Sequence, residues 1–200
     1  MSTQIEAPHP RPRVEGDREA EIFDATMDVL TDVGYDRLTM DAVAQRAKAS
    51  KATLYRRWNG KVSLVIDALH HHHNETPAAA VDTGSLREDL IASFCGVGGL
   101  TDKPELDAFG AILTAITRDP EFAAAFRRDV IGPKLAASRA LFERAQQRGE
   151  IGAGVDLDLF APALAGIVLH RFILLGEPPT RDVVTKIIDQ IILPAATAAG

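Results

Sequence analysis

The segment 39–61 constrains this chain more than any other part of its sequence. It contains two short amphipathic stretches, 40–47 and 51–57, joined by only a few residues. Two-turn helices are marginal by themselves in water, so both stretches must pack on a longer neighbour. We predict that this neighbour is a helix at 17–33, where apolar residues recur with a helical period until Gly34. Three helices with such a short connection predict a helix-turn-helix arrangement.

Each short stretch contains the residue types that begin a helix and bury one side of it. Thr39 and Ser50 stand directly before the stretches, where a hydroxyl side chain can cap the first backbone N–H groups. One apolar face per stretch is expected to pack inward, made by Val43, Ala44 and Ala47 in the first and by Leu54 and Trp58 in the second. The opposite faces would then be exposed to solvent.

The remainder of the chain also has the apolar periodicity and the breaker residues typical of helices. Further helices are predicted at 61–74, 85–99, 104–118, 120–148 (with a break at Gly132-Pro133), 156–175 and 180–196. We therefore predict an all-α fold of about nine helices. It would comprise an N-terminal three-helix helix-turn-helix domain and a C-terminal helical domain.

The charges are distributed unevenly along the chain, although the whole protein carries a net charge of −6. Residues 17–36 contain seven acidic residues and one basic residue, whereas residues 37–61 contain seven basic residues and one acidic residue. A short basic segment in an otherwise acidic protein indicates a local face that binds phosphate groups. The distribution favours a nucleic-acid partner for this segment alone.

The outward face of the second short stretch carries side chains that suit double-stranded DNA. The N-terminal part of a recognition helix reaches base edges in the major groove, so we assign Lys51, Ala52 and Thr53 to the bases. Contacts with phosphates fix the register without reading the sequence. We assign these contacts to Thr39, Ser50, Tyr55, Arg57 and Lys61.

The motif in this segment has a fixed order of residue types. It runs through Thr39, Val43-Ala44, Ala47-Lys48-Ala49-Ser50, Leu54-Tyr55, Arg57-Trp58 and Lys61. In this order and spacing it resembles the DNA-binding domain of the TetR family of bacterial repressors. The resemblance implies a homodimeric repressor that binds a palindromic operator and is released from it by a small-molecule effector.

One position departs from the family pattern, because Lys48 stands where the family has a turn glycine. If the turn requires a left-handed backbone, lysine costs about 1 kcal/mol relative to glycine. Two alternatives remain open: either the turn geometry shifts, or the lysine offsets this cost by contacting a phosphate. Lys48 is therefore included among the predicted DNA-binding residues.

Composition and resemblance together divide the chain into three parts. Residues 1–16 hold three of the eleven prolines and few apolar residues, which predicts a flexible N-terminal arm. Residues 17–74 are predicted to form the DNA-binding domain with its linking helix. Residues 75–200 are predicted to form the effector-binding and dimerisation domain.

The family resemblance implies an effector pocket within the helices at 85–148. Apolar walls with few charges favour a small hydrophobic ligand. The residues expected to line the pocket are Phe94, Cys95, Phe109, Leu113, Ile116, Phe122, Phe126 and Leu141. The alternative for each of them is ordinary core packing.

The last two predicted helices have unusually broad apolar surfaces, which need a partner on more than one side. A second copy of the chain is the favoured partner, because two-fold dimers are the commonest oligomers. The residues predicted for the dimer interface are Leu164, Val168, Phe172, Val184, Ile188 and Ile191. The alternative is that these helices are central in the core of one protomer.

A run of four histidines at the end of the predicted helix 61–74 offers a possible metal site. His70 and His73 lie on one helical face and could supply two ligands. No cysteine or second histidine cluster completes such a site, so a solvated helix end is favoured and no metal is predicted. A metal-sensing helix-turn-helix regulator that uses His70 and His73 remains the first alternative function.

Other classes of protein are disfavoured by what the sequence lacks. It has no dinucleotide-binding, P-loop, nucleophile-elbow or zinc-protease motif, so we expect no enzyme and no cofactor. Cys95 is its one cysteine, and we find neither a signal peptide nor an apolar run of about 18 residues. A cytoplasmic protein without a membrane partner is therefore expected. A helical scaffold or enzyme with an incidental basic patch is the last alternative.

Overall fold

The computed structural model describes residues 15–73, 81–96, 99–101 and 103–198. Every regular element in these ranges is helical, which confirms the all-α prediction. The predicted arm at 1–16 lies almost entirely outside the described residues. The helices are α1 (Glu15–Arg37), α2 (Met40–Arg46), α3 (Lys51–Arg57), α4 (Lys61–His73), α5 (Leu86–Cys95), α6 (Lys103–Arg118), α7 (Pro120–Ala125), η2 (Phe126–Ile131), α8 (Gly132–Arg148), α9 (Leu157–Leu175), α10 (Arg181–Ile187), η3 (Ile188–Ile192) and α11 (Leu193–Ala198).

The break predicted at Gly132-Pro133 is instead a wide π-helical turn, η2, inside a continuous helical path from α7 to α8. Proline has no N–H to donate, and its ring clashes with the carbonyl four residues before it. The wider turn accommodates both constraints, since the N–H of Gly132 donates to the carbonyl of Arg127, five residues earlier. The second π-helical turn, η3, likewise precedes a Leu193-Pro194 pair.

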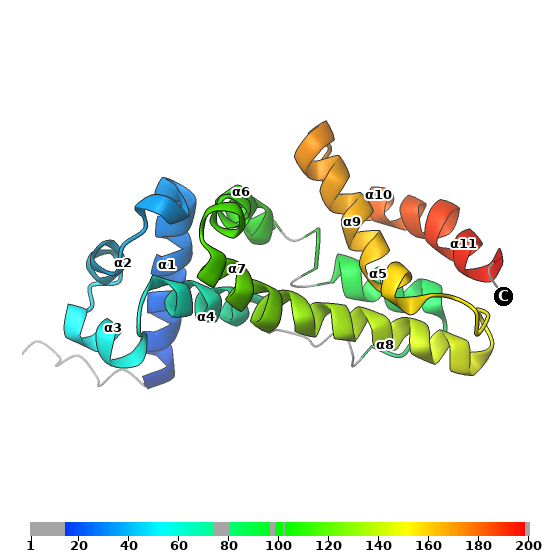
Figure 1. The fold of residues 1–200 in the computed structure, drawn as a ribbon, viewed down its shortest axis with the longest axis horizontal. Coiled ribbons are helices and arrows are strands. Elements are labelled where there is room, and N and C mark those ends of the chain that lie inside the picture. The colour runs from blue at the N-terminus through cyan, green and yellow to red at the C-terminus, as the bar shows by residue number, and fades with distance from the viewer. Residues whose placement is uncertain (1–14, 74–80, 97–98, 102, 199–200) are drawn as a thin grey trace, which may run out of the picture.

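The side chains pack into two hydrophobic cores, and Figure 1 shows how the helices that form them are arranged. The first core joins α1–α4 to α6, α7 and η2, and the second joins α5 to α8–α11. Helices α6 and α7, which we placed in the effector domain, therefore share their core with the helix-turn-helix. The domain boundary predicted at residue 74 therefore does not coincide with the division between the two cores. That residues 17–74 bind DNA and residues 75–200 bind the effector stays a prediction.

Tyr35 connects the helix-turn-helix to α6 and α7. Gly34 takes a left-handed backbone (φ 76°) and ends the regular part of α1, so that the Tyr35 ring is buried at 2% exposure. Its hydroxyl donates to Asp119 at 2.8 Å, and its ring lies 4.7 Å from that of Phe122. Burial, and then the hydrogen bond to Asp119, raise the pKa of Tyr35 far above its ordinary value. The phenol therefore remains a neutral donor.

A buried carboxylate, Asp89, connects α5 to the chain before it and to α8. It is fully buried and accepts from the backbone N–H of Thr83 at 2.7 Å and from the guanidinium of Arg148 at 3.2 Å. Burial by itself would raise the pKa of Asp89, but the bonds from Thr83 and Arg148 outweigh it and lower the pKa. Asp89 is therefore an ionised group whose partners stabilise the second core.

The structure corrects the set of residues predicted for a dimer interface. Four of them are buried in the second core of their own protomer: Leu164, Val168, Val184 and Ile188. A side chain already covered by its own chain cannot contact a second copy. Periodicity does not distinguish the inner from the outer side of a helix that is apolar on both. Phe172 is partly exposed and Ile191 is 47% exposed, so these two stay predictions.

Helix α9 leaves much of its apolar surface uncovered. One side packs on α8 and α10, whereas the other exposes Leu159, Gly166, Ile173 and Leu174. By length and composition alone, α9 could cross a membrane, although the core helix of a soluble protein can meet the same criterion. Only 22% of its most apolar window is buried. The exposed side of α9 is the largest uncovered apolar feature that we describe in the second core.

We predict that Tyr35→Phe lowers the free energy of unfolding by about 1–2 kcal/mol, because Asp119 loses a buried donor. Tyr55→Phe is the matched control, since Tyr55 is 57% exposed, and it should change stability by less than about 0.5 kcal/mol. Urea unfolding of both variants measures the difference. Equal effects of the two substitutions would contradict the role assigned to Tyr35.

We predict that Asp89→Asn costs about 3 kcal/mol at neutral pH, because Arg148 is left without its buried partner. A carboxylate with a lowered pKa stabilises the fold above the pKa of the unfolded chain, and this contribution is lost as the pH falls through the folded pKa. The difference between wild type and variant should therefore be constant near neutrality and shrink below about pH 4. Asp182→Asn, which removes an exposed pair with Lys186, is the control. A difference that does not change with pH would exclude this role.

Candidate nucleic-acid interface

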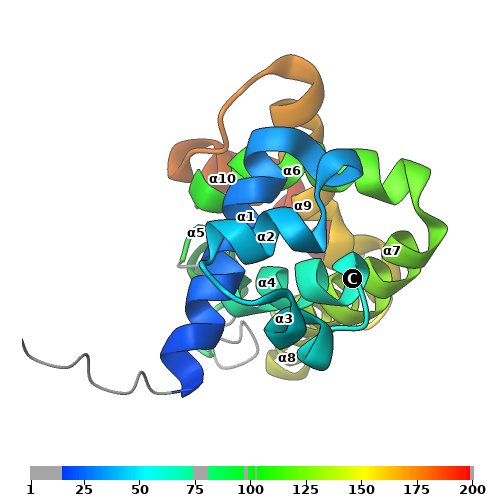
Figure 2. The same ribbon diagram turned by 90° about the vertical axis from the view of Figure 1, so that its left-hand side faces the viewer.

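Helices α2 and α3 lie at one end of the molecule (Figure 1), where they face the viewer in Figure 2, and α2 contacts both α1 and α3. Both begin at the predicted caps: the Thr39 side chain accepts from the N–H of Ala42, and that of Ser50 accepts from the N–H of Thr53, each at 3.1 Å. Each hydroxyl oxygen thus holds the first turn of its helix. Both residues are exposed, as a phosphate contact requires.

The buried faces of these two helices are those predicted from the sequence. The residues concerned are Val43, Ala44, Ala47, Leu54 and Trp58, all buried in the first core. The indole N–H of Trp58 donates to Asp67 of α4 at 2.9 Å, and its ring meets that of Phe23 of α1 edge-on. The orientation of α3 is therefore fixed from two sides.

The outward face of α3 is exposed along its whole length. Lys51, Ala52, Tyr55, Arg56 and Arg57 are all exposed, and Thr53 is partly exposed beside the Ser50 cap. A helix with one buried face and a cationic outer face at the end of a molecule has the shape and charge needed to enter a major groove. The structure thus brings the predicted base-contacting residues together on one surface.

The turn between α2 and α3 shows whether its geometry shifts at Lys48, which was one of the two alternatives left open by the sequence. Lys48 has φ 51° and is the one non-glycine residue with a positive φ among those described. The left-handed geometry of the family's glycine is therefore retained, and the strain of a side chain in it remains. The sequence analysis missed the residue that contacts this turn: the Arg18 guanidinium donates to the carbonyl oxygen of Lys48.

Two exposed cations of this surface are paired with acidic residues. Lys51 lies 2.5 Å from Asp41, and Arg57 lies 2.7 Å from Glu19 of α1. Exposed pairs of this kind contribute only about 0–1 kcal/mol, so DNA phosphates can replace the carboxylates at little cost. Both cations remain available for the predicted contacts.

Lys61 differs from the other cations of the predicted set. Its ammonium donates to the carbonyl of Tyr35 at 3.1 Å and lies 4.1 Å from the centre of the Tyr35 ring. It therefore stabilises the turn after α1 and points away from the outward face of α3. Its phosphate contact stays a prediction, and it would require the ammonium to leave these partners.

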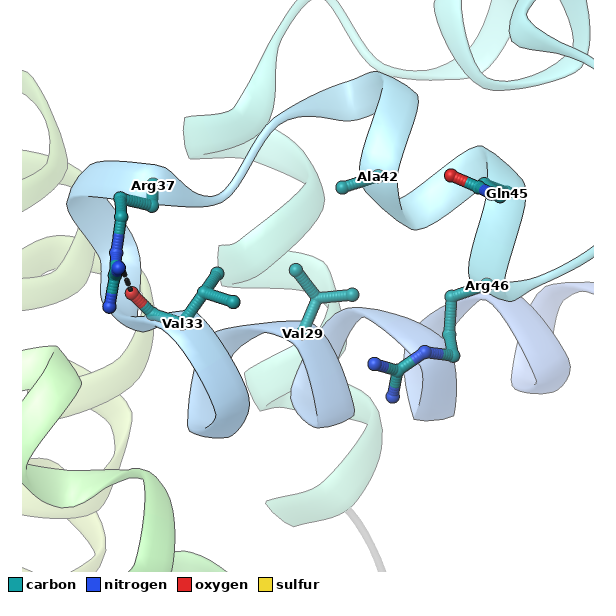
Figure 3. Close-up of a pocket in the computed structure, with 6 residues that line it drawn as sticks. All are labelled: Val29, Val33, Arg37, Ala42, Gln45 and Arg46. Carbon is teal, nitrogen blue, oxygen red and sulfur yellow. Dashed lines mark hydrogen bonds between the residues drawn. The ribbon is translucent and has the colours of Figure 1, made fainter.

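A cleft of about 520 Å³ separates part of α1 from α2 (Figure 3). Val29 and Val33 of α1 face Ala42 of α2 across it, with Arg37 and Arg46 at its two ends. The small side chain of Ala42 leaves this space unfilled. Arg46 spans the two helices instead, through ion pairs with Asp28 at 3.3 Å and Asp32 at 2.6 Å. Arg46 therefore joins α1 to α2 through two carboxylates, whereas one carboxylate is described for each of Lys51 and Arg57.

The residues predicted for an effector pocket are divided between the two cores. Three belong to the first core: Ile116, Phe122 and Phe126. Three belong to the second core or pack against it: Phe94, Cys95 and Leu141. The remaining two, Phe109 and Leu113, are partly exposed on α6. The structure therefore does not gather all eight residues in one place, and the pocket stays a prediction.

The histidine run supplies no metal site among the side chains that the structure describes. The ring of His71 lies 5.0 Å from that of Phe23, so it takes part in the packing of α4 on α1. His70 is partly exposed, and the side chain of His73 lies outside the described residues. The metal-sensing alternative therefore gains no support from this part of the molecule.

Comparison with known proteins connects this surface to one family. The family model for bacterial regulatory proteins of the tetR family matches residues 22–68. The model for the tetracyclin repressor-like C-terminal domain matches residues 80–191. The two matches cover most of both hydrophobic cores and include the segment 39–61.

Relatives with known names extend along most of the chain. An HTH-type transcriptional regulator of Mycobacterium tuberculosis is 34% identical over 183 residues, which cover 90% of this chain and 88% of the relative. The DNA-binding transcriptional repressor TetR of Mycobacteroides abscessus is 35% identical over 179 residues, which cover 88% of this chain and 92% of the relative. Both relatives are thus similar in length as well as in sequence.

Solved structures share the arrangement of the helices. The TetR family transcription regulator SCO0332 has a TM-score of 0.68 at 28% identity, over 88% of this chain and 97% of that structure. A transcriptional regulator from Pseudomonas aeruginosa PAO1 has a TM-score of 0.73 at 20% identity, over 94% and 97%. At 20% identity, the second similarity shows the fold alone.

Proposed function

Because this chain belongs to the TetR family and is a helix-turn-helix transcriptional regulator, we propose that it is a homodimeric repressor controlled by a small apolar effector. Two copies of α3 would enter successive major grooves of a palindromic operator, roughly 34–36 Å apart. The observation that carries this proposal is the exposed cationic face of α3, held by the caps and by the buried Trp58. The protein would act in the cytoplasm, where its DNA is.

We assign the contacts with DNA as the sequence analysis did. Lys51, Ala52 and Thr53 lie in the first turn of α3 and would meet the bases. The phosphates would be bound by Thr39, Ser50, Tyr55 and Arg57, with Lys48 and Lys61 as further candidates. On binding, Lys51 would leave Asp41 and Arg57 would leave Glu19, so that both cations could contact DNA.

The exposed side of α9 supports a dimer. Leu159, Gly166, Ile173 and Leu174 are exposed within the described protomer, and Ile191 of η3 is also exposed. Gly166 lies near the middle of α9 with no atom near the position of an added Cβ, so a second helix can approach the backbone there closely. We propose that a second copy covers this side, and that the predicted interface moves from the buried residues to these exposed ones.

The effector proposal is argued from partly covered side chains of α5 and α6 and from a buried hydroxyl group. Phe94 and Cys95 of α5 and Phe109 and Leu113 of α6 are only partly covered. The hydroxyl oxygen of Ser93 is buried without a hydrogen-bond partner in the described part of the chain. Partly covered apolar groups with one polar atom suit a small apolar ligand. Such a ligand would lower DNA affinity only as far as it prefers the released arrangement of the two heads.

We predict that Lys51→Ala combined with Tyr55→Ala weakens operator binding about a hundredfold or more, because each head loses one base contact and one phosphate contact. Arg139→Ala is a control, since Arg139 also carries an exposed positive charge but pairs with Glu143 in α8. Fluorescence anisotropy at matched salt, with fragments selected from the source genome, measures both affinities. Unchanged binding by the double variant would refute the proposed interface.

We predict that Gly166→Arg converts the dimer to a monomer without unfolding the protomer, because the added side chain has open space in the protomer and none in the proposed interface. Gly110→Arg is the matched control, since Gly110 is also an exposed helical glycine with open space around it, but on α6. Sedimentation equilibrium gives the mass, and circular dichroism gives the helix content. A dimeric Gly166→Arg protein would exclude this side of α9 as the interface.

A further inference from the structure

Arg18 joins the first turns of α1 to the turn of the helix-turn-helix, thirty residues later in the chain. Its Nη2 donates to the carbonyl oxygen of Lys48, and its Nη1 donates to a carboxylate oxygen of Glu21, both at 2.6 Å. The side chain is only 27% exposed, and both ends of its guanidinium have partners. A charged donor on a neutral carbonyl makes a stronger bond than a neutral pair does.

The carbonyl that Arg18 holds belongs to the strained residue of the turn. Within the turn, the N–H of Lys48 donates to the carbonyl of Gln45, and the N–H of Ala49 donates to that of Ala44. These bonds fix the turn on the side of α2. The carbonyl of Lys48 faces the other way, toward α1, and its direction sets where the chain continues into the Ser50 cap of α3.

A lysine disfavours the left-handed backbone that a glycine adopts freely. Without a bond to its carbonyl, the peptide after Lys48 can rotate toward a right-handed alternative. Such a rotation would move Ser50 and the first turn of α3, which hold the residues assigned to the bases. Only the fraction of heads with the left-handed turn would then fit DNA, and the apparent affinity falls with that fraction.

We propose that Arg18 is a positioning residue for the recognition helix, and that it offsets the replacement of the turn glycine by Lys48. This inference rests on the proposed role of α3 in reading the operator. Arg18 acts on DNA affinity through the carbonyl of Lys48, without itself contacting DNA. The strained residue therefore lies in the turn between α2 and α3, and the side chain that offsets the strain lies on α1.

The first test is Arg18→Ala, measured by anisotropy on the fragments selected by the wild-type protein. Two heads bind each operator, so the affinity should fall about ten- to thirtyfold. Because no phosphate contact is lost, the slope of log K against log salt concentration should stay unchanged. Thermal unfolding of the free protein accompanies each measurement, and Arg18→Gln replaces Arg18→Ala if that variant does not fold.

The second test is made at the turn itself. In the Arg18→Ala background, Lys48→Gly should bind DNA about ten- to thirtyfold more tightly than Lys48→Ala, because glycine adopts φ near 51° without strain. These two variants are compared with each other because both remove the Lys48 charge and any phosphate contact that it makes, whereas only Lys48→Ala keeps a Cβ. A purely structural role of Arg18 in α1 would not distinguish these two substitutions.

Three results would overturn the proposal. Arg18→Ala could leave the affinity unchanged, it could lower the salt slope by about 0.9 per head as a lost phosphate contact does, or Lys48→Gly could bind no more tightly than Lys48→Ala in the Arg18→Ala background. The Lys51→Ala, Tyr55→Ala variant separates these results from a failure of the proposed function. If that variant binds normally, the assignment of α3 is wrong. If only the Arg18 results fail, the assignment stands and the positioning role is wrong.

Discussion

The recognition surface depends on the burial of two helices that are too short to be stable alone. Helices α2 and α3 have seven residues each, about two turns, and exist because Val43, Leu54 and Trp58 are buried among α1 and α4. Helix α1 in turn ends at Gly34, which directs Tyr35 into contact with α7. The position of the DNA-reading helix is therefore determined by packing that extends well beyond the helix-turn-helix itself.

The acidic residues of α1 have a specific place in this arrangement. Asp28 and Asp32 hold Arg46, Glu19 holds Arg57, and Asp41 of α2 holds Lys51. The acidic segment and the basic segment of the sequence are thus joined in the structure by ion pairs between neighbouring helices. These carboxylates limit repulsion among the cations in the free protein. They also compete with DNA phosphates for the same cations, whatever the base sequence of the DNA.

Much of the interface could be predicted from the sequence, because caps and apolar faces are local properties. Thr39, Ser50 and the buried faces of α2 and α3 follow from spacing alone. The contact of Arg18 with Lys48 could not be predicted, since nothing in the local pattern shows which turn a distant side chain reaches. The burial of four of the six predicted dimer residues was missed for a different reason: on helices that are apolar on both sides, periodicity does not show that residues such as Leu164 and Val168 face inward. The π-helical turn before Pro133 was missed because a proline predicts a disturbance without specifying its form.

That π-helical turn makes one uninterrupted rod of α7, η2 and α8, with its first part in one core and its last part in the other. From Pro120 to Arg148 the rod is roughly 40 Å long at about 1.5 Å per residue. Over that length, a small change of angle at one end becomes a large displacement at the other end. A tilt of about 5° at the end near α9 would displace the opposite end by roughly 3–4 Å, which is close to the ~3.4 Å rise of one base pair. In the proposed dimer, small rearrangements around α5 and α9 would therefore be geometrically large enough to change the register of the two heads on DNA.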